Sequence, residues 1–532
     1  MRWACGAILV IGIACLAIPA DRFGRAPVYK IPPEQARKAS DEFLRTQSVD
    51  PGSFEHVTYP ALHWGDGDEL AAKYFLERLP LARASDLFER YRPIRHWMTR
   101  YFRGLDREEV SVSVHPETGR VRSVSHTIPE DRPGADIAED RARSIAAEFA
   151  ASMGWDVTAM DLKESSSEKK KARRDYTLVW EARPGDPRNA GEARWRVQVG
   201  VAGDRAVSAG GFWKLPETFE RERERANALS IILLIARILV TAGLAVLGIW
   251  LLIQGIRNGA VRWRPALRLA LPGGLLLPVS GLLSVHLLMR NYDTAYPLRT
   301  FEAMTYLGLA MAVLAGFVVL LAAAALIIAY IPEAISALRA VNRRAMGIDA
   351  AAAVLAAIGF ALIVTQVDAA LVQRFHAQAL PSFAEPSLVA TRAPAIAALA
   401  NAVRDWLRDA ASLTLIALLW WRLPKRWVAS VGALVAVCAM LPGEVRTPGE
   451  VVLYYALALI AVACAAAFCI WFGRRNWLAY ALVLWLLALR APLLELLGNG
   501  NPSLDAQGWA ILAVMAASIL WVAAPAFGRA RN

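Results

Sequence analysis

The strongest pattern along the chain is a long apolar run over residues 226–256, in which Arg237 is the one charged residue. A helix rises about 1.5 Å per residue, so roughly thirty residues exceed the roughly 30 Å of a bilayer hydrocarbon core. The run therefore predicts a membrane-spanning helix. The residues before it are mostly polar and charged, whereas the chain after it is apolar nearly to its end.

Eight further apolar runs predict eight more spans, at 269–289, 303–331, 350–372, 411–421, 428–441, 451–472, 477–489 and 508–527. Basic residues are concentrated in every second loop, which is the charge bias of cytoplasmic loops. This alternation predicts nine spans with a cytoplasmic C-terminus and an extracytoplasmic polar region. The two shortest runs either extend into the amphipathic stretch at 395–410 or are half-buried or re-entrant.

The N-terminus, residues 1–20, contains a short apolar segment that follows Met1 and Arg2. Such a segment is either a cleaved signal peptide or an uncleaved signal anchor, and both would export the residues that follow. Because no clean small-x-small cleavage site is present, an uncleaved anchor is favoured. We therefore expect ten spans in all and a cytoplasmic N-terminus.

Two segments of the polar region, 31–50 and 137–156, align without a gap. The identical pairs are Ile31/Ile137, Ala36/Ala142, Arg37/Arg143, Glu42/Glu148, Phe43/Phe149 and Asp50/Asp156. Both segments have the apolar spacing of amphipathic helices. A fixed offset of this kind predicts an internal repeat of two α+β units, at 21–130 and at 131–225, with the second including a charged stalk.

Strand patterns follow each predicted helix. Val110, Val112 and Val114 alternate with polar residues, and a Pro- and Gly-containing turn at 115–119 leads into a second strand at 120–128. Similar alternation predicts strands in the second unit at 176–180, 195–201 and 206–212. The highly charged segment 164–174 is expected to be a solvated loop.

A helix followed by a strand, a Glu-Thr-Gly turn and another strand resembles the PepSY domain. The matching residues are Ala142–Ala146 on the helix and Val114–Val121 at the hairpin. The resemblance implies two diverged copies of a small α+β module that lies outside the membrane and binds or restrains partners without being a catalyst. The resemblance implies an envelope peptide or protein bound by residues 21–225 as a partner, and the predicted spans imply the lipid bilayer.

The order of an exported domain followed by many spans also resembles the N-terminal part of long bacterial members of the CAAX-protease and bacteriocin-processing (CPBP) family. Those proteases have a Glu-Glu-x-x-x-Arg motif and later histidines on membrane helices, which bind a metal. The only adjacent glutamates of this chain, Glu108 and Glu109, lie in the polar region. No catalytic residue is therefore carried over, and a divergent or truncated intramembrane metalloprotease stays an alternative.

Composition narrows the possible functions. The 532 residues are 56% hydrophobic and 20% charged, which fits a soluble domain joined to a membrane domain. The net charge of +12 comes largely from arginines in short loops between spans, so nucleic-acid binding is not expected. The five cysteines lie in apolar segments and suggest no disulfide framework. No nucleophile elbow, phosphate loop or zinc-protease motif is present, and no cofactor is predicted.

Ionisable residues inside or beside apolar spans are the default functional candidates in a membrane protein. Five are singled out: Arg237, His286, Glu302, Asp368 and His376. The last four lie near the outer ends of their spans and could line an outward-facing cavity. The alternative is that they reach the membrane interface and form hydrogen bonds within loops.

We interpret the sequence as a multi-pass protein of a bacterial inner membrane whose exported domain is a binding or regulatory module. A transporter is a further alternative, since ten spans would suffice. It is supported by a single Pro-Gly break at 271–274, and no inverted repeat is visible in the sequence.

Overall fold

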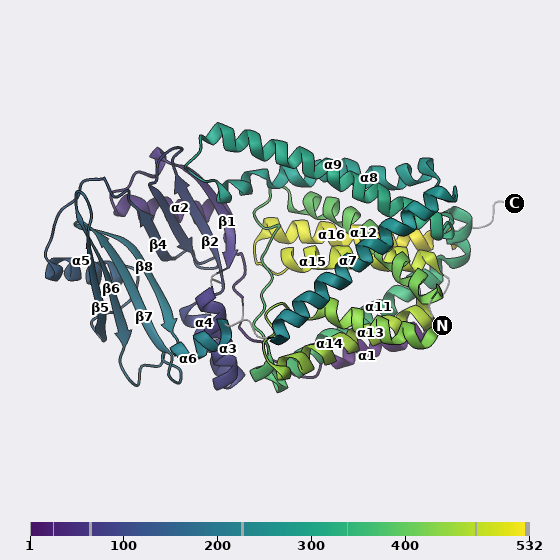
Figure 1. Ribbon diagram of the computed structural model, residues 1–532, viewed down its shortest axis with the longest axis horizontal. Coiled ribbons are helices and arrows are strands. Elements are labelled where there is room, and N and C mark those ends of the chain that lie inside the picture. Colours follow the sequence, from purple (N-terminus) through teal and green to yellow (C-terminus); the bar gives the residue numbers. More distant parts are fainter. Residues whose placement is uncertain are drawn as a thin grey trace.

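The structure is a computed structural model that describes residues 2–24, 26–62, 66–224, 228–337, 339–422, 424–473 and 476–526. An antiparallel β-sheet with its helices lies at one end of the molecule, and a bundle of long helices extends away from it (Figure 1). The expected order of an α+β domain followed by a helical domain is confirmed. The basic residues Arg474, Arg475, Arg529 and Arg531, which contributed to the predicted topology, lie outside the described residues.

The α+β domain has two halves with related element orders. The first contains α2 (Pro33–Thr46), β1 (Glu55–Leu62), α3 (Asp66–Arg78), α4 (Leu81–Tyr91), β2 (Arg95–Phe102), β3 (Glu109–Val114) and β4 (Val121–Thr127). The second contains α5 (Glu139–Ser152), β5 (Met160–Lys169), β6 (Arg174–Ala182), β7 (Arg194–Ala202) and β8 (Arg205–Lys214). Apart from the α3–α4 insertion, each half is one helix followed by four strands.

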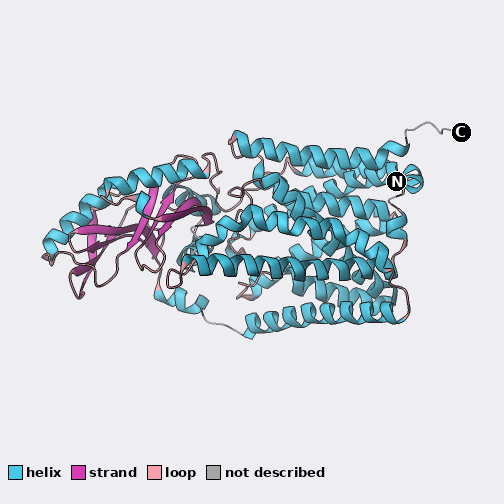
Figure 2. Ribbon diagram, turned by 90° about the horizontal axis from the view of Figure 1, so that it is seen from above, coloured by secondary structure: helices cyan, strands magenta, loops and turns pink. Residues whose placement is uncertain are grey.

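The eight strands form one sheet in the order β1-β2-β3-β4-β8-β7-β6-β5. The two halves meet where β4 pairs with β8, with Val124 opposite Ala209. Helices α2 and α5 cover the sheet on one side (Figure 2). The three alternating valines of β3 are fully buried, because successive side chains of a strand point to opposite faces and these share the covered one.

One local expectation is wrong. Segment 164–174, expected as a solvated loop, continues strand β5 and turns into β6, with Ser166 opposite Thr177. Because β5 is the last strand of the sheet and most of its side chains are exposed, it lacks the alternation of apolar and polar residues that marks a half-buried strand.

The helical domain follows a short stalk helix, α6 (Glu217–Glu224). Its long helices are α7 (Ala228–Arg257), α8 (Trp263–Ser284), α9 (Leu298–Tyr330), α11 (Ala340–Arg374), α12 (Pro394–Arg422), α13 (Lys425–Met440), α14 (Pro448–Ala467), α15 (Trp477–Leu496) and α16 (Pro502–Ala523). Each of the nine overlaps one predicted span.

Within the described residues, seven helical segments are long and apolar enough to cross a membrane, which supports a multi-pass protein. Helices α12 and α13 are not among them. Helix α12 extends the short predicted span 411–421 backward through the amphipathic stretch at 395–410, as one of the alternatives anticipated. Helix α13 has 16 residues.

The N-terminal apolar segment forms α1 (Arg2–Cys15), which runs parallel to α11. Contacts follow in the same order along the two segments. They begin with the Arg2–Asp349 ion pair at 2.7 Å and end, just beyond α1, where the Asp21 amide donates to the Gln373 side chain at 3.2 Å. In between, a Cβ atom at Gly12 would lie 2.6 Å from the backbone oxygen of Gly359. Two glycines thus let the helices approach closely, as in many membrane helix pairs.

Candidate functional site at the junction of sheet and helices

A buried ionic cluster joins the α+β domain to the helical domain. Lys73 on α3 places its Nζ 3.0 Å from the carboxylate of Glu450 on α14 and 3.3 Å from that of Glu77. Arg223 on α6 lies 2.5 Å from Glu450 and 2.7 Å from Glu77. Four charges from three separate parts of the chain therefore form one network, which we call the junction cluster.

Glu450 is held in place by its own helix as well as by the two cations. It is the third residue of α14 and forms a capping box with Thr447, in which the side chain of each residue accepts a hydrogen bond from the backbone amide of the other. Its Oε2 also accepts from the Arg446 amide at 2.7 Å. The residue is 0% exposed, so these bonds replace the water that its carboxylate has lost.

Lys73 also forms several polar contacts. Its ammonium donates to the backbone oxygens of Ala377 at 2.8 Å and Ala379 at 3.0 Å, in the loop that follows α11. Burial lowers the pKa of Lys73, while the neighbouring Glu450 carboxylate acts in the opposite direction. Two positive and two negative groups leave the cluster neutral overall, which is the condition under which buried charges are tolerated.

Further polar contacts tie the two domains together away from the junction cluster. Arg100 on β2 pairs with Glu109 at 2.7 Å and donates to the backbone oxygen of Arg290 at 3.0 Å. The Tyr29 amide, in the segment before α2, donates to the side chain of Asn499 at 3.0 Å, in the loop before α16. The contacts are therefore spread across the face of the helical domain that meets the sheet.

The sequence-predicted candidates do not form one site. His376 lies beside the junction cluster, with Nδ1 2.8 Å from the Leu76 backbone oxygen. His286, in the segment that follows α8, contacts the other end of the loop after α11, with Nε2 3.1 Å from the Ala390 backbone oxygen. Each histidine thus forms a hydrogen bond with a backbone oxygen of a neighbouring segment. Such bonds were the expected alternative to an outward-facing cavity lined by these side chains.

The other three candidates are separate. Arg237 on α7 donates to the backbone oxygen of Leu441, beyond α13. Asp368 on α11 is half-buried, and Glu302 on α9 is exposed. Among the described residues, no three His, Cys, Asp or Glu side chains are close enough together to hold a metal ion.

Sequence reasoning missed the four residues of the junction cluster. Two local signals were available. Thr447 followed three residues later by Glu450 is a capping-box pattern at the start of an apolar helix. Lys73 is a lone charge between apolar residues 70–72 and 74–76. The contact between Lys73 and Glu450 depends on tertiary structure, because 377 positions separate the two residues in the chain.

Comparison of this chain with protein-family models, with curated proteins and with solved structures gives no match.

Proposed function

We propose that this protein is a regulatory membrane protein in which an exported α+β domain binds an envelope peptide or protein and passes its occupancy to the membrane helices. The junction cluster is the observation that carries the proposal. It joins α3 of the exported domain, the stalk helix α6 and the first turn of α14 through ion pairs of 2.5 to 3.3 Å.

The junction cluster requires more free energy of desolvation than a protein that only anchored its α+β domain would need. A flexible stalk would be enough to tether a binding domain, whereas removing Lys73, Arg223 and Glu450 from water carries a desolvation penalty that close pairing has to offset. An arrangement that fixes α3 against α14 means that a displacement of one helix must be matched by the other. This gives the membrane domain a physical means of responding to the exported domain.

The free edge of the sheet is where we place the partner. Strand β5 ends the strand order on one side, whereas β1 at the other edge lies against the helical domain at residues 285–291. Edge strands leave backbone groups available for strand addition by an extended peptide. The lysines and glutamates of β5 limit indiscriminate pairing of the edge strand.

The test has two readouts on the full-length protein in membranes. A photo-crosslinking residue at Ser166 on β5 should yield an adduct with an envelope partner, whereas the same residue at the exposed Glu148 on α5 should not. The partner should then change amide hydrogen exchange in the first turns of α14, and Lys73→Met should abolish that change. Equal adducts at both positions, or an unchanged α14, would refute the proposal.

A further inference from the structure

Helix α12 carries a row of charges inside the helical domain, which the proposed function does not use. Arg404, Asp405, Arg408, Asp409 and Ser412 lie on one side of the helix, and we call them the polar face of α12. Side-chain exposures are 44% for Arg404, 25% for Asp405, 60% for Arg408 and 40% for Asp409. Within the part of the chain that the structure describes, the ion pairs of these four charges are all with one another, at 3.0 to 3.2 Å.

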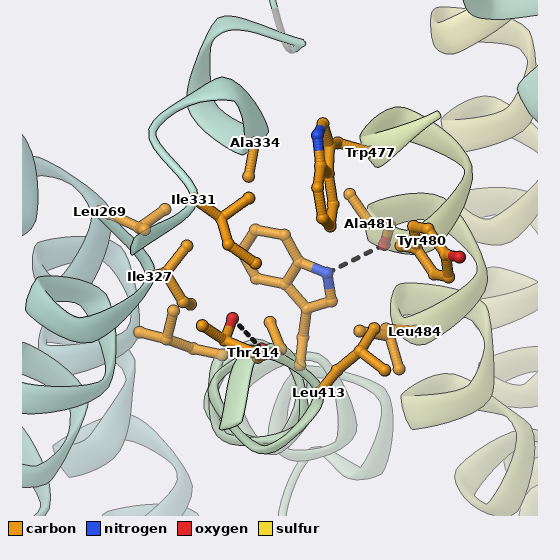
Figure 3. Close-up of a pocket in the computed structure, with 13 residues that line it drawn as sticks. Leu269, Ile327, Ile331, Ala334, Leu413, Thr414, Trp477, Tyr480, Ala481 and Leu484 are labelled. Carbon is orange, nitrogen blue, oxygen red and sulfur yellow. Dashed lines mark hydrogen bonds between the residues drawn. The ribbon is translucent and has the colours of Figure 1, made fainter. Parts of the chain in front are cut away.

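The opposite side of α12 is apolar and packed. Residues of α8, α9 and α15 surround a cavity of about 70 Å³ beside α12 (Figure 3). Trp406 on α12 lines this cavity, and its indole NH donates to the backbone oxygen of Ala481 at 2.9 Å. Thr414, on the same side of α12, donates a hydrogen bond from its hydroxyl to the backbone oxygen of Ala410. The polar face therefore points away from this packed layer.

Neighbouring helices fix the depth of the polar face. A Cβ atom at Gly273, in the middle of α8, would lie 3.5 Å from Val403. Leu407 packs in one cluster with Ala266 and Ala270, nearer the start of α8. The charges at 404–409 therefore lie between the middle of the helical layer and the end remote from the sheet, where a bilayer would place acyl chains.

Acyl chains are a poor environment for these groups, because ionisable side chains within a membrane face water, protein or a ligand. Helix α7 does not cover them by close packing. Its buried residues are Leu251 and Gly255, and it meets α12 further along, where Leu251 clusters with Leu418 and Leu415. The outer two-thirds of α7 is exposed or half-buried along its described length.

We propose that the polar face of α12 lines a water-filled groove, open sideways to the bilayer, that binds the phosphate–ammonium headgroup of a zwitterionic phospholipid. Arg404 and Arg408 are one helical turn apart, and so are Asp405 and Asp409. The two guanidinium groups would hold the phosphate and the two carboxylates the ammonium. The equal number of positive and negative groups favours a neutral headgroup that carries both charges over an anionic one.

The groove is tested first by accessibility. In full-length protein with its five cysteines replaced by alanine, Ser412→Cys is compared with Leu314→Cys, which lies at the centre of α9 and is 58% exposed. A charged, membrane-impermeant maleimide should modify the first variant much faster than the second in nanodiscs. Equal rates would overturn the groove.

The ligand is tested with photoactivatable phosphatidylethanolamine and phosphatidylglycerol in the same nanodiscs. The ethanolamine lipid should label 404–412 preferentially, and Arg404→Gln/Arg408→Gln should reduce its labelling about tenfold, as expected for lost charge-assisted bonds. The matched variant Arg404→Lys/Arg408→Lys retains both positive charges, so it should still be labelled by the ethanolamine lipid and serves as the control for folding. Asp405→Asn/Asp409→Asn should abolish the preference between the two lipids.

Two results would overturn the ligand. One is equal labelling of wild-type protein by both lipids. The other is full competition by soluble glycerophosphoethanolamine at the concentration of the lipid probe, since this would make a free small zwitterion the occupant.

Discussion

Phe43 on α2 and Phe149 on α5 face each other with ring centroids 6.3 Å apart. These two residues occupy equivalent positions in the two aligned segments 31–50 and 137–156. Residues close to a two-fold axis contact their own equivalents, and the mirrored strand order on either side of the β4–β8 pair has the same character. The arrangement supports the prediction that the α+β domain consists of two copies of one unit.

This contact yields a first prediction. Phe43→Leu and Phe149→Leu should show a coupling of about 0.5 to 1.5 kcal/mol in a double-mutant cycle, because a tilted aromatic pair contributes beyond its buried area. The measurement is chemical unfolding of the full-length protein in detergent, followed by tryptophan fluorescence. Strict additivity of the two substitutions would contradict the pairing.

The junction cluster gives a second prediction. Lys73→Met should lower the free energy of unfolding by about 3 kcal/mol, because removing one partner leaves the buried Glu450 and the partly buried Glu77 with a single cation. Arg183→Met is the matched control, since Arg183 and its partner Asp161 are each 58% exposed and surface pairs contribute little. A loss as small as that of the control would mean that the cluster is open to water.

A third prediction concerns acid. Burial, with a smaller contribution from Arg92, lowers the pKa of His96 on β2 to about 3. An unfolded histidine binds a proton near pH 6.5. Stability from neutral His96 is therefore complete above that pH and is lost as the pH falls, at up to about 1.4 kcal/mol per pH unit.

His96→Gln should flatten the decline in stability between pH 6.5 and pH 4. Thermal unfolding of both proteins across this range measures the slope, and His115→Gln at a half-buried position serves for comparison. Parallel slopes in wild type and His96→Gln would show that His96 does not resist protonation.

The helix pair α1–α11 gives a fourth prediction. Gly12→Leu should separate the helices and lower the unfolding temperature, because its side chain would meet the Gly359 backbone. Gly6→Leu adds the same side chain to the same helix where a Cβ atom has no neighbour within 4 Å, and should have little effect. Equal behaviour of the two variants would argue against packing of α1 on α11 in the membrane.

Topology supplies a fifth prediction. The alternation of basic loops predicts that Asn291 lies outside the cell and Arg343 inside it. Reporter fusions active only in the periplasm should therefore be active at Asn291 and inactive at Arg343. Activity at both positions would exclude the proposed arrangement of spans.

The sequence predicted the layout of this protein better than its site. Apolar runs and turn residues act locally, so the positions of the nine long helices and of strands such as β3 were readable. Helices α3 and α4, between β1 and β2, were not predicted, because that segment has neither a repeat nor an alternation of apolar and polar residues. Strand β5 was missed because an exposed edge strand has no buried face to leave a pattern.

The junction cluster was hidden for a different reason. Ranking charges by their position within apolar runs selected Arg237 and Asp368, whereas Lys73 and Arg223 lie in regions that are polar overall. A buried ion pair between distant segments leaves no periodic signal in either one. The four groups come together because α3 and the stalk helix α6 both lie against the first turn of α14.

The bond between Tyr29 and Asn499 sets an order on how this protein can be made. Synthesis proceeds from the N-terminus, so the segment leading into α2 emerges long before the loop that precedes α16. The same holds for α1, whose partner α11 follows more than three hundred residues later. Docking of the α+β domain on the helices can therefore be completed only after the last helices have been inserted, and its docking face stays uncovered until then. Factors that assist membrane protein assembly would have that interval in which to act.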